Sequence, residues 1–191
     1  MNLTSTDILQ IFKDTGALMK GHFKLTSGLH SDTYFQCAKV LQYPWEAEKI
    51  CSLIAEHFKG YDIQLIASPA IGGIVIGYQV ASLMHKRSVF TERKNGTMTL
   101  RRGFQIQNKE NVLIVEDVTT TGGSVKEVME VVKEQGGIVA GVASMVDRSG
   151  GKADFNVPFY STFQMEVMNY SPEDCPLCKK GIPIAKPGSR K

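Results

Sequence analysis

The sequence lacks a long apolar run and a strong charge of either sign, and each absence excludes a class of protein. No stretch approaches the roughly 20 apolar residues that cross a bilayer, and residues 1–20 show no basic segment followed by an apolar core, as a secretion signal would. The 22 basic and 19 acidic residues leave a net charge of only +3, which offers nucleic acid no large electrostatic footprint. We therefore expect a cytoplasmic protein that binds neither membranes nor nucleic acid.

Cysteines are too few and too scattered for a disulfide scaffold, so we expect reduced thiols at Cys37, Cys51, Cys175 and Cys178. Cys175 and Cys178 have the two-residue spacing of zinc ligands, but they supply only two ligands and no histidine lies near them in the sequence. We interpret the pair as a turn in the tail and expect no metal site in the protein, unless a symmetry-related subunit brings a second pair.

The segment 112–124 is the most informative part of the chain. Four apolar β-formers at 112–115 predict a buried strand, and the apolar stripe within 125–135 predicts a helix. The turn between them opens that helix, where free backbone N–H groups and the positive end of the helix dipole stabilise a phosphate. The candidate ligand-binding residues of this segment are Glu116, Asp117, Val118, Thr119, Thr120, Thr121, Gly122, Gly123 and Ser124.

The two acids of this segment indicate which phosphate compound it binds. Carboxylates repel a polyphosphate, but Glu116 and Asp117 can accept hydrogen bonds from the diol of a ribose. The turn also lacks the lysine with which the phosphate-binding loops of nucleotide-hydrolysing enzymes bind a triphosphate. The sequence therefore favours a sugar phosphate and disfavours a triphosphatase. The simpler alternative is an acidic helix start in any α/β protein.

Helix and strand patterns alternate along the chain, which predicts one α/β domain over residues 1–191 with a central parallel sheet flanked by helices. Helices are expected at about 7–14, 44–59 and 74–85, and a strand at 63–66. Residues 1–40 contain glycines at 16, 21 and 28, which predict short strands outside the main sheet in a small hood. Residues 172–191 are rich in Pro, Gly and Lys and are expected to form a surface tail of low order.

A second loop, residues 68–73, lies between the strand at 63–66 and the helix at 74–85. Ligands of open α/β sheets bind at the carboxyl edge of the strands, so Ala70, Ile71, Gly72 and Gly73 are candidates to hold a second phosphate group on backbone N–H donors. Taken alone, the loop also fits an ordinary turn.

A basic arm over residues 90–104 turns at Asn95 and Gly96, a strong hairpin signal. Its four cations could close over a phosphate ligand and neutralise charge during bond cleavage. They are Arg93, Lys94, Arg101 and Arg102. The alternative is a solvated edge hairpin protected by its charges.

Residues 115–122 resemble the motif of type I phosphoribosyltransferases that binds PRPP, the diphosphate-activated ribose phosphate. Within this family, residues 23–31 with Tyr34 and Phe35 resemble the substrate hood of the orotate phosphoribosyltransferases, and Asp147–Arg148 ends the strand after the motif helix as in those enzymes. The resemblance covers roughly residues 10–150. It implies transfer of the phosphoribosyl group from PRPP to orotate with Mg²⁺, which gives orotidine 5′-monophosphate and pyrophosphate in de novo pyrimidine (UMP) biosynthesis.

The resemblance also implies roles for individual residues. Arg93, Lys94 and residues 116–124 bind PRPP, and residues 70–73 bind its pyrophosphate. Asp117 and Lys94 are catalytic, and Thr120 and Arg148 bind orotate. A homodimer with shared active sites is implied, because the basic loop of such enzymes reaches the neighbouring subunit.

The sequence departs from many orotate enzymes at three places. Ile71–Gly72 stands where they have a tyrosine–lysine pair, and Thr26 replaces a hood lysine. The basic loop is shorter and lacks a later lysine and histidine, which leaves the catalytic cation open among Lys94, Arg101 and Arg102.

Two other functions are compatible with the motif, namely a purine phosphoribosyltransferase and a non-catalytic regulator that senses PRPP. Arg148 favours orotate, because a guanidinium binds a carboxylate bidentately and a purine has no carboxylate. The alternative for Asp147 and Arg148 is a surface ion pair that contributes little.

Overall fold

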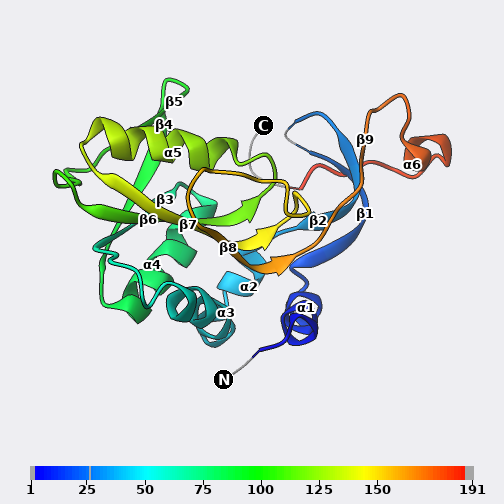
Figure 1. Ribbon diagram of the computed structural model, residues 1–191. Helices are drawn as coiled ribbons and strands as arrows, with labels where there is room; N and C mark the ends of the chain where they lie inside the picture. Colours follow the sequence, from blue (N-terminus) through cyan, green and yellow to red (C-terminus); the bar gives the residue numbers. More distant parts are fainter. Residues whose placement is uncertain (1–2, 26, 188–191) are drawn as a thin grey trace.

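A large central sheet and a small lateral sheet organise the chain (Figure 1). The computed structural model describes residues 3–25 and 27–187. Within these residues the central sheet has the strand order β5-β4-β3-β6-β7-β8. Its strands are β3 (Leu65–Pro69), β4 (Arg87–Lys94), β5 (Thr97–Leu100), β6 (Asn111–Thr119), β7 (Ile138–Asp147) and β8 (Phe159–Gln164). All neighbours pair in parallel except β4 and β5, so the predicted α/β fold is confirmed and an antiparallel edge strand makes the sheet mixed.

Helices cover both faces of the central sheet (Figure 1). One face carries α1 (Ser5–Asp14), α3 (Pro44–His57) and α4 (Gly72–Met84), and the other carries α5 (Gly123–Glu134). Phe12, Ile54 and Ile76 belong to the core cluster on the first face, whereas Val128 and Val132 belong to the cluster under α5. The short helix α2 (Ala38–Leu41) leads into α3. Among the described residues, no helix combines the length and apolar character needed to cross a bilayer.

The helix boundaries follow local signals in the sequence. The Thr4 side chain accepts from the Asp7 N–H, and the Asp7 carboxylate accepts from the Thr4 N–H, so this capping box starts α1 two residues before the predicted position. Pro44 occupies the first turn of α3 as predicted. The helix that follows β3 starts at Gly72 and not at Ile74, so the glycines of the second loop belong to the helix start.

Two strands extend further than the apolar pattern predicted. β6 continues through both acids to Thr119, and β3 includes Ser68 and Pro69, which the sequence had assigned to a break. A proline fits here because the pairing of β3 with β6 ends at Ala67, so the missing N–H costs no bond on that side. The Ala70 N–H then donates to the Thr91 carbonyl at 2.7 Å on the other side.

The lateral sheet forms the hood, and it draws on both ends of the chain. Its order is β1-β2-β9, with β1 (Leu18–Lys24), β2 (His30–Phe35) and β9 (Asn169–Tyr170). The predicted short strands outside the main sheet are therefore present, but a strand from the C-terminal part completes them.

The tail is more ordered than its composition predicted. It forms the short helix α6 (Pro176–Lys179) and returns to β1, where Ala185 accepts from the Lys24 N–H at 2.9 Å and donates to the His22 carbonyl at 2.8 Å. The Cys175 and Cys178 pair lies beside two histidines of the hood and not in an isolated turn. Thr26 and residues 188–191 lie outside the described residues.

Candidate active site

The strand, loop and helix start predicted for the candidate phosphate cradle are present. Gly122 is the N-cap of α5 with φ of 73°, and a Cβ there would lie 2.6 Å from the Phe155 ring, so both backbone and space require glycine. Thr120, Thr121 and Gly123 are exposed around this turn. The first N–H groups of α5 have no partner within the helix, which makes the turn suited to a phosphate monoester.

The two acids sit at the end of β6, just before the cradle. Glu116 is buried and accepts from the Asp117 N–H at 3.0 Å. Asp117 is half-buried, and its Oδ1 accepts from the Val118 N–H at 2.8 Å. Local backbone donors therefore fix both carboxylates in place, as holding a ribose diol requires.

The second loop lies directly against Asp117. A Cβ placed on Gly72 would be 2.7 Å from Asp117 Cγ and 2.9 Å from Asp117 Oδ1. The N-cap of α4, Ile71, makes no side-chain capping bond, so the first N–H groups of this helix are also available to a ligand. The structure thus brings the two predicted loops together at one edge of the sheet. The peptide bond between Ala70 and Ile71 is cis.

The register of β6 and β7 places Arg148 beside the cradle. Thr119 pairs with Asp147, and the Arg148 N–H donates to the Thr119 carbonyl at 2.8 Å. Thr120 follows β6 and Arg148 follows β7, so these two residues leave the sheet side by side.

Arg148 is buried with unused hydrogen-bonding capacity. It is 7% exposed, its Nη2 donates to the Thr33 carbonyl at 3.4 Å, and its Nε has no partner among the described residues. Burial lowers its pKa, an effect that Tyr34 and Asp32 oppose. A buried guanidinium remains charged, so an unpartnered N–H on it indicates an anionic ligand.

The alternative of a surface ion pair between Asp147 and Arg148 is wrong. Asp147 is 1% exposed and accepts from the N–H groups of Ser149 and Gly151 at 2.8 and 3.1 Å. Its carboxylate organises the loop after β7, and within the described residues it makes no ion pair with Arg148.

Two hood residues complete the surroundings of Asp117. Burial raises the pKa of Tyr34, the Asp117 carboxylate raises it further, and Arg148 opposes the shift. Burial also raises the pKa of Cys37 well above its ordinary value, and Asp117 and Glu116 add to the effect. Cys37 is therefore a neutral thiol, and its Sγ lies 3.8 Å from the Asp117 carbonyl oxygen as a donor. The sequence had no signal for Cys37, because its role depends on how the hood folds over β6.

The basic arm is a hairpin, as predicted, with Asn95 and Gly96 at φ of 52° and 86° in its two-residue turn. Arg93 pairs with Glu127 of α5 at 2.8 Å. Arg101 and Arg102 pair with Glu92, at 3.4 and 3.1 Å.

These ion pairs distinguish the candidate cations of the arm. Lys94 is exposed and, within the described part of the chain, has no carboxylate within ion-pair distance. Among these four cations Lys94 is the one whose charge is free for a ligand, whereas Arg93 is paired with Glu127 of α5.

Comparisons with known proteins agree with this geometry. The family model of the phosphoribosyl transferase domain matches residues 38–179. An orotate phosphoribosyltransferase of Chlorobaculum parvum is 57% identical over 98% of this chain and 97% of its own length, and one of Caldicellulosiruptor bescii is 55% identical over 96% of each. The crystal structure of orotate phosphoribosyltransferase from Aeropyrum pernix superimposes with a TM-score of 0.69 at 24% identity, over 83% of this chain and 94% of that one.

The contact between Gly72 and Asp117 gives a first test. We expect Gly72→Ala to weaken PRPP binding by about tenfold, or ~1.4 kcal/mol, because the new methyl group would displace the carboxylate. Gly60→Ala is the matched control, since a Cβ there meets nothing within 4 Å. Calorimetric titration measures both affinities, and thermal melting checks the fold. Unchanged PRPP affinity in Gly72→Ala would show that the second loop does not need its close approach to Asp117.

Proposed function

The chain belongs to the phosphoribosyltransferase family, and we infer that within it the protein is an orotate phosphoribosyltransferase. It transfers the phosphoribosyl group of PRPP to orotate and releases pyrophosphate. The product, orotidine 5′-monophosphate, leads to UMP in pyrimidine biosynthesis. The high identity to curated orotate enzymes over nearly the whole chain supports this reaction.

The single observation that carries the choice of acceptor is Arg148. Its buried guanidinium has an unpartnered Nε at the sheet edge beside the cradle, where the carboxylate of orotate would satisfy it. A purine offers no carboxylate and would leave this buried donor unpaired, which costs free energy. We therefore prefer orotate to a purine. The identity to enzymes likewise favours catalysis over a PRPP-sensing regulator.

Each part of the site then has a task in the reaction. The turn at 119–124 holds the 5′-phosphate, Asp117 and Glu116 hold the ribose diol, and residues 70–73 hold the pyrophosphate. With the ribose fixed, the orotate nitrogen forms a bond to the anomeric carbon as the bond to pyrophosphate oxygen breaks, through an oxocarbenium-like transition state. The pyrophosphate leaves with the bonding electrons, and Lys94 offsets its charge.

The site also suits Mg²⁺ as a cofactor that arrives with PRPP. Magnesium prefers oxygen ligands and is commonly held by one or two carboxylates together with substrate phosphates. Asp117 supplies such a carboxylate at the contact with the pyrophosphate loop, and Glu116 lies next to it. When bound, Mg²⁺ supplies positive charge that offsets the charge of the leaving diphosphate.

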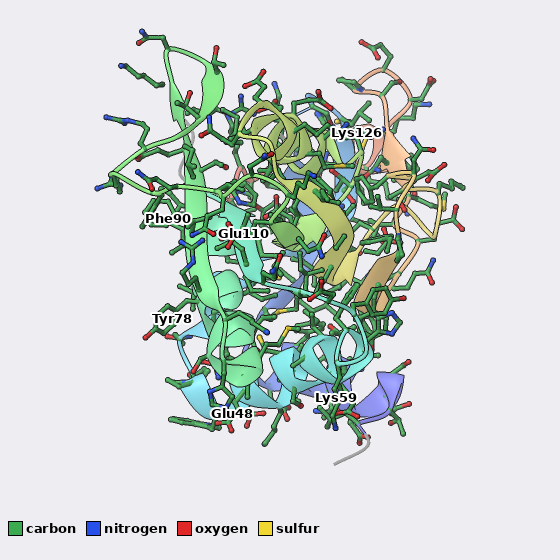
Figure 2. The ribbon with its side chains drawn as sticks, turned by 60° about the vertical axis from the view of Figure 1, so that its left-hand side comes forward. Glu48, Lys59, Tyr78, Phe90, Glu110 and Lys126 are labelled. Carbon is green, nitrogen blue, oxygen red and sulfur yellow. The ribbon has the colours of Figure 1, made fainter. Side chains whose placement is uncertain are left out.

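We also propose a homodimer with shared active sites. Ile71, Val75 and Tyr78 form an apolar stripe that starts at the pyrophosphate loop and continues along α4, and they are 79%, 50% and 69% exposed. Figure 2 shows Tyr78 at the edge of the molecule. Such a stripe suits an isologous contact with a second copy, which would bring the partner's basic arm toward this site.

A cytoplasmic location fits the thiols of this enzyme. All four cysteines lie in the described residues and are free, as expected in a reducing compartment.

Replacement of Arg148 tests the acceptor assignment. We expect Arg148→Ala to raise the orotate KM by on the order of 10- to 100-fold, since a charge-assisted contact contributes roughly 1.5 to 3 kcal/mol. The PRPP KM should change much less. Arg148→Lys keeps the charge without the planar fork, so its orotate KM should lie between those of the wild type and of Arg148→Ala. The loss of orotate absorbance on addition of PRPP and Mg²⁺ measures the rates. Equal weakening of both substrates would mean that Arg148 is structural and would favour a purine acceptor.

Asp117→Asn tests the diol assignment. The amide keeps the shape and still accepts from the Val118 N–H, so the melting temperature should be unchanged while turnover falls on the order of 100-fold. Glu116→Gln should lower turnover less than Asp117→Asn does. The exposed Asp14→Asn is the matched control. A fully active Asp117→Asn enzyme would refute the assignment.

Subunit complementation tests the shared site. Because Arg101 and Arg102 pair with Glu92, we choose Lys94 as the proposed catalytic cation and would mix inactive Lys94→Ala subunits with inactive Asp117→Asn subunits. Half of the randomly reassorted dimers are hybrids, and each hybrid has one intact site if the arm acts on its neighbour, so roughly a quarter of sites should recover. Arg102→Ala, whose cation is paired with Glu92, should remain active on its own. No recovery after verified exchange would mean that each arm serves its own subunit or that the protein is not such a dimer.

A further inference from the structure

Four metal-binding side chains from distant parts of the sequence converge on the outer side of the hood. One comes from β1, one from the start of β2, and two from the segment that forms α6. Their ligand atoms all lie within 4.8 Å of one another. They are His22, His30, Cys175 and Cys178.

Four of the six distances between these ligand atoms fit a tetrahedron around one ion. His22 Nε2 and His30 Nδ1 are 3.1 Å apart. Cys178 Sγ lies 3.3 Å from His30 Nδ1 and 3.6 Å from His22 Nε2, and Cys175 Sγ lies 3.5 Å from His22 Nε2. Zinc–nitrogen and zinc–sulfur bonds of ordinary length, at tetrahedral angles, would separate two nitrogens by about 3.3 Å and a nitrogen from a sulfur by about 3.6 Å.

The surroundings of His22 fix which of its nitrogens faces the cluster. His22 Nδ1 lies 2.7 Å from the Ile182 carbonyl oxygen, an acceptor, so Nδ1 carries the proton. In the neutral tautomer with this hydrogen bond, Nε2 has the free lone pair, and it is the nitrogen that faces the two sulfurs. A histidine that ligates a metal typically donates its other N–H to a carbonyl or a carboxylate in this way.

Burial shows that the cluster is enclosed. His22, His30 and Cys175 are 3%, 7% and 0% exposed, and Cys178 closes the outer side. Two neutral histidines and two thiolates would balance the charge of one divalent cation. Without an ion, the two thiols could offer the ring nitrogens only weak S–H hydrogen bonds.

We propose that these four side chains bind one zinc ion. Two imidazoles and two thiolates are a donor set that zinc favours and magnesium does not. Four protein ligands leave no open position, which is the arrangement of a structural and not a catalytic site. The ion links the tail to the hood, although more than 140 residues of sequence separate the histidines from the cysteines. It adds to the backbone hydrogen bonds that join Ala185 to β1.

The site also stabilises the strand that enters the active site. His30 begins β2, and the same strand carries Thr33, whose carbonyl oxygen accepts from Arg148, and Tyr34. A zinc ion at the start of β2 therefore limits the freedom of the hood residues that surround the acceptor base.

Metal analysis of the purified full-length protein tests the proposal. The protein is produced in zinc-supplemented medium and purified without chelators, and we expect about one zinc ion per chain by mass spectrometry. Cys178→Ser should lower the zinc content at least tenfold and reduce the melting temperature, because metal binding contributes to folding free energy. Cys178 is the exposed ligand, so its replacement leaves the packing of the hood intact. The control Cys51→Ala removes a thiol from the main core and should keep its zinc.

Cobalt substitution provides a second readout that does not depend on variants. Wild-type protein loaded with Co²⁺ should show strong visible absorption of a tetrahedral ion and a thiolate-to-cobalt charge-transfer band. Wild-type protein that binds neither metal, with Cys175 and Cys178 joined in a disulfide or freely reactive, would overturn the proposal. Equal zinc contents in the wild type and in Cys178→Ser would overturn it as well.

Discussion

The parallel pairing of β3, β6 and β7 is the constraint on which the site depends. Because these strands run in one direction, the loops that follow them emerge at the same edge of the sheet. Their register then decides which residues meet: Ala67 opposite Ile114 brings the second loop to the acids, and Thr119 opposite Asp147 brings Arg148 to the cradle. Each loop alone is an ordinary connection. Their alignment brings together the residues that we propose to bind phosphate, ribose, diphosphate and base.

Much of this arrangement follows from local sequence, because its signals act over short distances. The strand, acids, hydroxyls and glycines at 112–124 predicted the cradle, since each residue type has a direct physical role there. Asn95 and Gly96 predicted the hairpin, because few other residues adopt their backbone angles. The strand ends predicted from the sequence were less accurate than the turns. Apolar runs show where a strand is buried, whereas β6 continues through acids because ladder bonds with β7 remain available to them.

The features that sequence could not supply all depend on contacts between distant segments. The sequence left the catalytic cation open among Lys94, Arg101 and Arg102, because it could not show that Glu92 pairs with both arginines. The sequence led us to interpret Cys175 and Cys178 as a turn in the tail, because the histidines beside them are more than 140 residues away in the chain. Composition also described the tail as weakly ordered, since it cannot show that Ala185 extends the hood sheet.

The glycine at position 72 affects the charge balance of the pocket. Many orotate enzymes place a lysine there, but here the backbone packs so closely on Asp117 that a longer side chain would displace its carboxylate. The loop that we propose for pyrophosphate therefore brings no cation of its own to a site that holds two carboxylates. These carboxylates repel a bare polyanion on approach. We therefore expect the diphosphate to bind together with divalent counterions, so that affinity for this ligand rises with their concentration in solution.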